Sequence, residues 1–196
     1  SPPSWVIGTS RREFAPITVA RLQGWFAEPI LTRSGYAGVC IHLLTPTGDM
    51  HQITDMRPGD GSLVMQAYSG GIDLGATTME GSAICRQTLA VQNLTASADG
   101  RLGKGKKTKW AVQGPAGFES DVAGKRFAQP LSEQLRRVFE AAEIPVDLRR
   151  GGWDLIAFGA HLMGAHGPAL IARLEQSDQP WRLRIAIDDP SVTFRH

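Results

Sequence analysis

The chain has 196 residues, of which 42% are hydrophobic and 20% are charged, and its formal net charge is +2. These values are typical of a folded soluble protein with one sizeable core or two small ones, and they exclude an intrinsically disordered chain. No apolar run approaches the roughly 20 residues that span a bilayer, and no secretory signal is visible, so we expect no membrane partner.

The first half of the chain indicates short strands separated by turns. Strands are expected over residues 16–24, 34–44, 50–56, 62–68 and 107–113. The first of these could also be one or two helical turns. The second and third form a hairpin, because Thr45–Asp49 carries turn residues between them. The stretch 77–94 is ambiguous, because Ile84, Thr88 and Val91 could mark a helix face while residues 89–92 alternate as a strand does; we expect a short helix over 78–88 and then a strand.

The second half contains the clearest helix, expected from Pro130 to Glu143. Its apolar residues recur with the helical period and would form one stripe: Leu131, Leu135, Val138, Phe139 and Ala142. The opposite face would be polar and includes Gln134. A buried strand is then expected over 153–158, and a closing hairpin is expected from 168–175 and 181–187, with a polar turn between its arms.

Many short strands, frequent turns and one clear helix predict a fold class: a β-rich α+β protein of mostly antiparallel strands, rather than alternating βαβ units. Gly, Pro and Ser cluster near residues 114–124. A boundary there would separate a β-rich part, 1–114, from a part with the helix and the closing hairpin, 115–196. The two parts could equally form one continuous domain.

The segment from Asp99 to Trp110, named here the Gly/Lys loop, is the most informative part of the sequence. It carries a net charge of +4, and its cationic residues are Arg101, Lys104, Lys106, Lys107 and Lys109. Lysines on a glycine-containing loop can reach phosphates, with counterion release supplying free energy, and Trp110 could stack on a base. The alternative is a solvated hairpin loop whose Trp110 points into the core.

Catalytic motifs are absent from the sequence. Gly100–Lys106 has the glycine and lysine spacing of a P-loop, but Lys107 stands where Ser or Thr must hold Mg²⁺, and a β-like stretch follows instead of a helix. No Gly-x-Ser-x-Gly elbow exists, and the acidic pair Asp188–Asp189 suits an exposed turn. We therefore expect no catalytic residues and no cofactor.

The histidines offer one weaker hypothesis. His42 and His51 lie on opposite arms of the expected hairpin, and with Asp49 or Asp55 they could form the metal site of a hydrolase. A second histidine pair, His161 and His166, has a spacing of five residues. That spacing does not place both rings on one face of a helix.

The cysteines bear on the cell compartment, and the ratio of arginine to lysine bears on the source organism. Cys40 and Cys85 cannot build a disulfide framework, and we expect small buried thiols in a reducing cytoplasm. Arginine outnumbers lysine sixteen to five, which is typical of a GC-rich bacterial genome.

Residues 98–107, with 110–112 after them and 130–134 further on, resemble the region outside the metal finger in some bacterial SWIM zinc-finger proteins. Residues 154–158 and the closing hairpin are also similar to it, so the resemblance covers about half of the chain. The Cys-x-Cys…Cys-x-His finger itself is absent, and no zinc ligands carry over. The resemblance implies an accessory domain of a bacterial cytosolic protein that associates with nucleic acid or protein.

The sequence therefore predicts a non-enzymatic domain that contacts nucleic acid or an acidic partner through the Gly/Lys loop. The alternative is a protein–protein scaffold or assembly domain that uses an apolar surface or an open strand edge.

Overall fold

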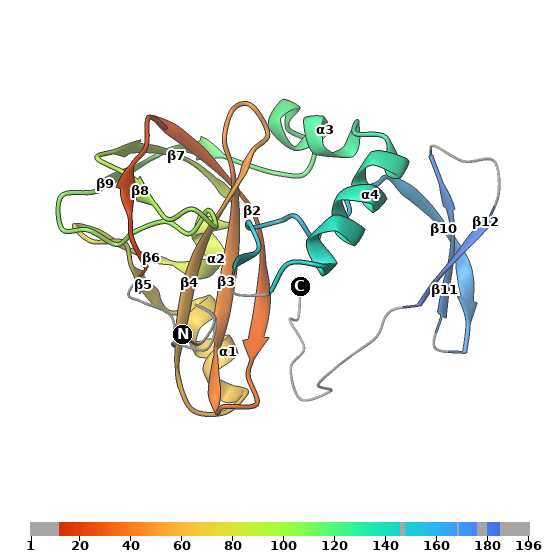
Figure 1. Ribbon diagram of the computed structural model, residues 1–196, viewed down its shortest axis with the longest axis horizontal. Coiled ribbons are helices and arrows are strands. Elements are labelled where there is room, and N and C mark those ends of the chain that lie inside the picture. Colours follow the sequence, from red (N-terminus) through yellow and green to blue (C-terminus); the bar gives the residue numbers. More distant parts are fainter. Residues whose placement is uncertain (1–11, 146–147, 168, 176–179, 185–196) are drawn as a thin grey trace, which may run out of the picture.

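The computed structural model describes residues 12–145, 148–167, 169–175 and 180–184. Over these residues the chain forms mostly antiparallel strands and a few helices, so the expected β-rich α+β fold is confirmed (Figure 1). No helix in the described ranges is long and apolar enough to cross a membrane.

The largest sheet has five strands, and every neighbouring pair in it is antiparallel. Its strands, in spatial order, are β4 (Met50–Pro58), β3 (Tyr36–Leu44), β2 (Arg21–Leu31), β7 (Gln87–Gln92) and β9 (Lys109–Pro115). The β3–β4 pair is the hairpin expected from the sequence, with Tyr36 opposite Pro58 at one end and Leu44 opposite Met50 at the other.

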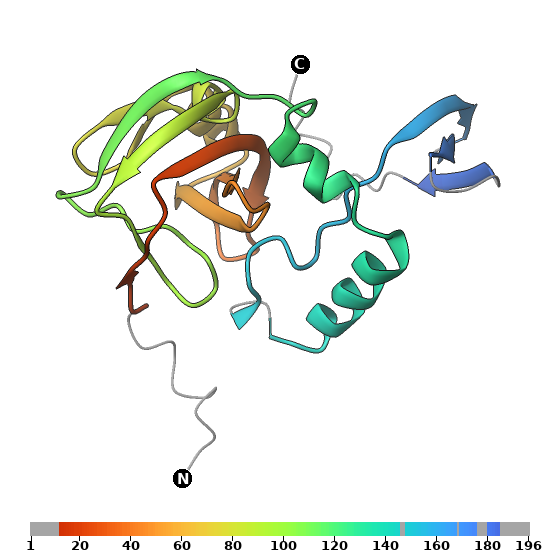
Figure 2. The ribbon, with the colours of Figure 1, turned by 90° about the horizontal axis from the view of Figure 1, so that it is seen from above.

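This sheet curls back on itself, as the view from above shows (Figure 2). Gln52 on the edge strand β4 forms a parallel bridge with Arg101, and the next residue, Leu102, bridges to β8 (Thr95–Ala96). The short β8 pairs in turn with β1 (Ala15–Pro16). The first part of the Gly/Lys loop is therefore built into the wall of the curled sheet.

The main core fills the inside of the curl. Alternate side chains of β3, namely Val39, Ile41 and Leu43, are fully buried against residues such as Ile53 of β4 and Leu89 of β7. Burying a side chain of this kind stabilises the fold by about 1.5–3 kcal/mol. The helix α1 (Ser62–Ser69) packs against β3 and adds Val64 to this core.

The other face of β3 is also covered. Leu44 and Met50 form a second cluster with Trp25, under α3 (Asp121–Phe127) and Ala157. This cluster joins residues from the two halves of the chain. Because both faces are covered, β3 is buried along almost its whole length.

The strand expected over 62–68 is wrong, because these residues form α1. Val64 and Ala67, three residues apart, both face the core, a spacing that fits one face of a helix and does not fit the alternation of a strand. The carboxylate of Asp60 accepts hydrogen bonds from the backbone N–H of Ser62 at 2.9 Å and from its hydroxyl at 2.6 Å, so it satisfies a free donor of the first turn.

The other elements of this half are short. The strands β5 (Gly71–Asp73) and β6 (Thr78–Glu80) pair with each other, and α2 (Gly81–Ile84) follows directly. The helix expected over 78–88 is thus a single turn, while the strand expected after it is present as β7. The strand expected over 16–24 is present only at its two ends, in β1 and at the start of β2.

The expected amphipathic helix is α4 (Leu131–Ala142), but its packed face is rotated from the apolar stripe, so that Leu131, Leu135 and Val138 are only half-buried. Its buried residues are Gln134 and Ala141, whereas Phe139 is 70% exposed. The strand expected over 153–158 is also wrong. That segment has no strand ladder, and the backbone of Ala157 pairs with the side chain of Gln134 instead.

A separate three-stranded antiparallel sheet follows, made of β10 (Ala160–His166), β11 (Ala169–Leu174) and β12 (Pro180–Arg184). It stands apart from the curled sheet (Figures 1 and 2). The expected closing hairpin is confirmed as β11 and β12. Residues 185–187 of its second arm lie outside the described residues, and β10 was not expected.

Candidate functional site

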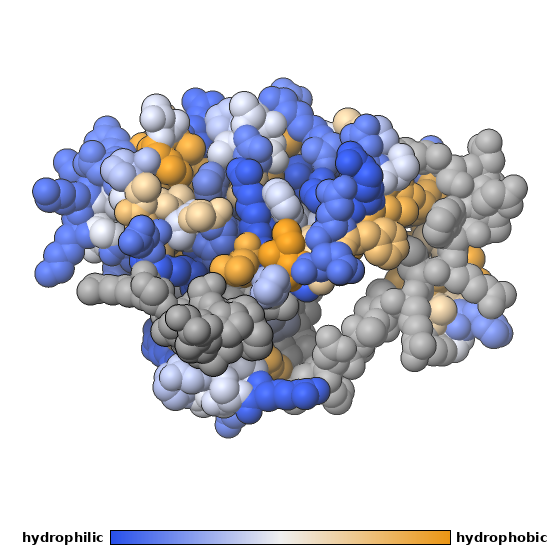
Figure 3. Space-filling view, in the orientation of Figure 1, coloured by the Kyte–Doolittle hydropathy of each residue, from blue (hydrophilic) through white to orange (hydrophobic). Residues whose placement is uncertain are grey.

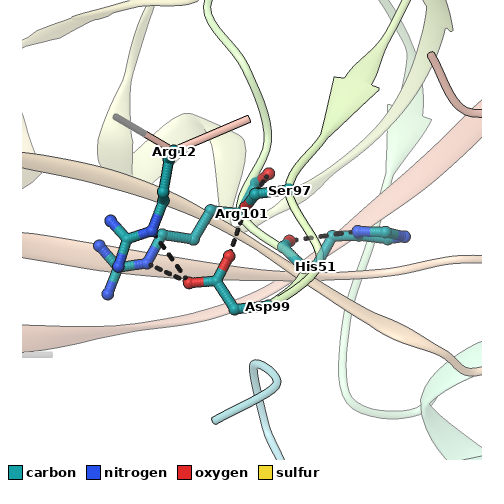
Figure 4. A network of polar contacts seen from close by, with 6 residues as sticks. Arg12, His51, Ser97, Asp99 and Arg101 are labelled. Carbon is teal, nitrogen blue, oxygen red and sulfur yellow. Dashed lines mark hydrogen bonds and ion pairs between the residues drawn. The ribbon is translucent and has the colours of Figure 1, made fainter. Parts of the chain in front are cut away.

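The first part of the Gly/Lys loop is held by backbone and side-chain contacts. Gln52 accepts the N–H of Leu102 at 2.8 Å and donates its own N–H to the carbonyl of Gly100 at 3.1 Å. The carboxylate of Asp99 accepts a hydrogen bond from Ser97 and lies 3.3 Å from the guanidinium groups of both Arg12 and Arg101 (Figure 4).

The tip of the loop is a turn tied to Asn93. The N–H of Thr108 bonds to the carbonyl of Gly105 at 2.9 Å, and its buried hydroxyl donates to the carbonyl of Asn93 at 3.1 Å. The side-chain amide of Asn93 donates to the carbonyl of Lys107 at 3.1 Å. Asn93 has a φ of 55°, a left-handed conformation that asparagine tolerates better than most residues. The loop is therefore fixed at both its base and its tip.

The five expected cationic contacts divide into two groups. Arg101 pairs with Asp99, and the ammonium of Lys104 lies 3.5 Å from the carboxylate of Asp55. The other three, Lys106, Lys107 and Lys109, are exposed and form no ion pair with any described residue. Hydrophilic residues gather at this edge of the molecule, over the loop between β8 and β9 (Figure 3).

Trp110 is not a surface platform. It is 7% exposed, belongs to the main core, and donates its indole N–H to the carbonyl of Leu74 at 3.1 Å. Because Trp110 is buried, the expectation that it stacks on a base is wrong. The alternative stated from the sequence, a Trp110 that points into the core, is the arrangement found.

An exposed aromatic ring does lie beside the loop, and sequence reasoning missed it. Phe14 is 44% exposed and sits over Gly103, where a Cβ atom would come within 3.1 Å of the ring. The ring also lines a hollow of about 580 Å³, together with Ser97, His51 and Arg150. Phe14 carries no local signal in the sequence, because only the β1–β8 pairing brings it to the loop.

The two hairpin histidines do not face one another. The β3–β4 register places His42 opposite Gln52 and His51 opposite Leu43, so the two imidazole rings lie on opposite faces of the sheet. The expected His42/His51 metal site is therefore wrong. His51 instead bonds to the carbonyl of Gly100 through Nδ1 at 3.2 Å, and burial, with Arg150 acting in the same direction, lowers its pKa.

His42 belongs to a second polar cluster, on the face of the sheet that α3 covers. Cys40 and His42 lie two residues apart on β3, and the register brings Glu28 of β2 opposite Cys40. A ring nitrogen of His42, the sulfur of Cys40 and a carboxylate oxygen of Glu28 all lie within 4.8 Å of one another. Burial raises the pKa of Cys40 to about 12, and the charge of Glu28 adds to the effect.

Comparison with known proteins does not place the chain in a family. No family model matches it, and no curated protein matches it. A solved structure described as "Structural mimicry for functional antagonism" aligns with a TM-score of 0.34 and 9% identity, over 89% of this chain and 75% of the other. A second, described as "Molecular basis for abrogation of activation of pro-inflammatory cytokines", aligns with a TM-score of 0.33 and 7% identity, over 90% and 80%. Likenesses at this level carry no argument about function.

Proposed function

We propose that this chain binds an anionic macromolecule, with single-stranded nucleic acid as the favoured ligand, through the Gly/Lys loop. The observation that carries the proposal is the placement of Lys106, Lys107 and Lys109, three exposed cations without an ion pair to any described residue, on a loop that is fixed at its base and at its tip. A fixed loop loses little conformational freedom on binding, so more of the electrostatic attraction contributes to affinity.

The aromatic ring next to the loop favours a single strand over a duplex. Proteins that bind single strands combine a cationic track with exposed rings, and each stacked base contributes about 1–3 kcal/mol. Phe14 supplies such a ring, and Arg150, an exposed cation, lines the same hollow. Bases stacked on Phe14 would leave the phosphates of the same strand within reach of Arg150. The two buried, free cysteines favour a reducing compartment, which supports the cytoplasmic location expected from the sequence.

The test is fluorescence anisotropy with labelled single-stranded and double-stranded DNA and RNA at several salt concentrations. The triple variant Lys106→Glu, Lys107→Glu, Lys109→Glu should weaken binding for every base sequence. If each lysine neutralises one phosphate, the slope of log K against log salt should lose about 2–3 units.

A matched control separates local contacts from net charge. Reversing Arg33, Arg136 and Arg173, all exposed and outside the loop, changes the net charge by the same six units, from +2 to −4. The control should retain most of the affinity of the unmodified chain. If both triple variants lose affinity equally, net charge and not local contact with the loop explains the loss. If the unmodified chain does not bind at low salt, the proposal is refuted.

A second candidate function, protein–protein association, rests on an exposed apolar surface. Phe139 on α4 is 70% exposed, and Leu162 and Met163 on β10 are 69% and 63% exposed. Hydrophobic residues are visible in the region of α4 (Figure 3). Large apolar side chains gathered on a surface commonly mark an interface. Binding at this surface should be insensitive to salt and should weaken in the variant Phe139→Glu, while the lysine variants leave it unchanged.

A further inference from the structure

The cluster of Glu28, Cys40 and His42 contains an unusual pairing of a buried nitrogen with a carboxylate. His42 is 1% exposed, and its Nε2 atom has no hydrogen-bond partner among the described residues. Yet Nε2 lies only 3.3 Å from Oε1 of Glu28. The contact is close enough for electrostatic attraction but lacks hydrogen-bond geometry.

The other ring nitrogen indicates which tautomer the site suits. Nδ1 of His42 lies 3.2 Å from the sulfur of Met50, which is a weak acceptor. An N–H at Nδ1 can therefore donate a hydrogen bond to this sulfur. That tautomer leaves a lone pair on the buried Nε2 atom, which lies 3.3 Å from Oε1 of Glu28. The ring is held in this orientation by stacking on Phe26, with the two centroids 4.5 Å apart. Two electron-pair donors this close repel each other unless a cation, either a proton or a metal ion, lies between them.

We propose that Glu28, Cys40 and His42 bind a zinc ion through a carboxylate oxygen, Sγ and Nε2. The three residues supply the oxygen, sulfur and nitrogen donors that zinc accepts, and together these exclude the hard cations Mg²⁺ and Ca²⁺, which prefer oxygen alone. One thiolate and one carboxylate also balance the two charges of the ion. A neutral site of this kind suits a half-buried position, where an excess charge would be costly.

The three donor atoms need to move only slightly to reach the spacing of a zinc site. In a tetrahedral zinc site the ligand atoms lie about 3.5 Å apart, which follows from metal–ligand distances of about 2.0–2.3 Å. The Nε2–Oε1 distance of 3.3 Å already meets this value. The widest separation among the three donor atoms stays below 4.8 Å, and Glu28, whose side chain is 45% exposed, is free to move toward the other two.

The same exposure leaves one coordination position facing solvent. Cys40 and His42 are buried, so water reaches the ion only from the side of Glu28. Three protein ligands with a fourth position open is the pattern of zinc sites that bind water or an external ligand. On binding, the thiol of Cys40 releases its proton to solvent, and the thiolate takes its place in the coordination shell.

The experiment uses Co²⁺ as a spectroscopic probe of the purified, chelator-treated chain, since a thiolate bound to Co²⁺ produces a charge-transfer band. The unmodified chain should show this band, and one equivalent of Zn²⁺ should remove it by displacement. Glu28→Gln, at a half-exposed position that does not threaten folding, should weaken Co²⁺ affinity by more than about tenfold, because even outer-shell changes cost that much.

Two cysteine variants decide whether the band belongs to this cluster. Cys40→Ser should abolish it, and Cys85→Ser, at the other buried thiol, should leave it unchanged. Circular dichroism confirms that each variant is folded. The proposal is overturned if the unmodified chain gives no charge-transfer band, if the band survives in Cys40→Ser, or if Glu28→Gln binds Co²⁺ as tightly as the unmodified chain. None of these outcomes bears on the Gly/Lys loop.

Discussion

The side chain of Gln134 pairs with the backbone of Ala157 much as a neighbouring strand would. Its amide nitrogen donates to the carbonyl of Ala157 at 2.8 Å, and its amide oxygen accepts the N–H of the same residue at 2.8 Å. The nitrogen also donates to the carbonyl of Gln129 at 2.9 Å. Gln134 is 1% exposed, so one polar residue of α4 satisfies a buried segment that has no strand beside it.

We expect the substitution Gln134→Leu to lower the free energy of unfolding by about 2–5 kcal/mol, since it leaves buried backbone groups without partners at a cost of about 1–3 kcal/mol each. Urea unfolding followed by circular dichroism measures the loss. Glu133→Leu, at an exposed position of the same helix, is the control and should change stability by less than about 0.5 kcal/mol. Equal losses in the two variants would contradict this role of Gln134.

This pairing also explains why the face of α4 could not be read from the sequence. The periodicity located the helix to within one residue at each end, because spacing and the flanking prolines are local signals. The burial of Gln134 depends on a backbone 23 residues away, and no local pattern reveals it. The β3–β4 hairpin was predictable for the opposite reason, since its turn residues lie between its arms.

The residues of the candidate sites also divide into those whose placement follows from local sequence and those whose placement depends on long-range pairing. Exposure of Lys106 and Lys107 follows from the local density of glycine and lysine, and the sequence indicated it. The direction of Trp110 depends on its register with Val91 across β7 and β9, both buried, and the sequence left it open. The approach of Glu28 to Cys40 depends on the pairing of β2 with β3, which single-sequence patterns do not provide.

The two aromatic residues near the Gly/Lys loop should respond to substitution in opposite ways. Trp110→Phe leaves the carbonyl of Leu74 without its donor, so we expect it to lower the free energy of unfolding by about 1–3 kcal/mol. Phe14→Leu keeps an apolar side chain over Gly103 and should change stability little, but it removes a stacking surface worth about 1–3 kcal/mol per base.

Binding and unfolding are therefore measured on both variants, at a temperature where each is folded. Phe14→Leu should weaken binding of a single-stranded oligonucleotide, and Trp110→Phe should not. If Trp110→Phe weakens binding and Phe14→Leu does not, the assignment of the stacking surface to Phe14 is wrong.

His51 should make the stability depend on pH below its ordinary pKa of 6.5. Burial and Arg150 lower the pKa of His51 in the folded chain, and these effects outweigh the opposing ones of Gly100 and Asp49. As the pH falls below 6.5, the unfolded chain takes up a proton that the folded chain does not, so the free energy of unfolding decreases until the pH reaches the lowered folded pKa. Above 6.5 this contribution is complete.

Urea unfolding between pH 7.5 and pH 5.5 tests this dependence. His51→Gln removes the titrating group and keeps a donor for the carbonyl of Gly100, so its stability should fall less over that range than the stability of the unmodified chain. His161→Gln, on β10, is the control and should follow the unmodified chain. A steeper fall in His51→Gln would show that the sign is wrong.

The two thiols should be unreactive in the metal-free folded chain. Burial raises the pKa of Cys40 to about 12 and that of Cys85 to about 11, and both residues are less than 9% exposed. At pH 8 the thiolate fraction is then about one in ten thousand for Cys40 and one in a thousand for Cys85, and the thiolate is the reactive form. Iodoacetamide followed by mass spectrometry should label neither residue quickly, and both in urea.

A charge change next to Cys40 sharpens this test. Burial raises the pKa of both thiols; the carboxylate of Glu28 adds to the increase at Cys40, whereas the charge of Arg86 opposes the increase at Cys85. As the pH is raised, Cys85 should therefore react before Cys40 in the unmodified chain. Glu28→Gln should speed the labelling of Cys40 and leave the rate at Cys85 unchanged. If both rates rise together, the variant has loosened the fold and the electrostatic explanation fails; if neither rises, burial alone protects Cys40.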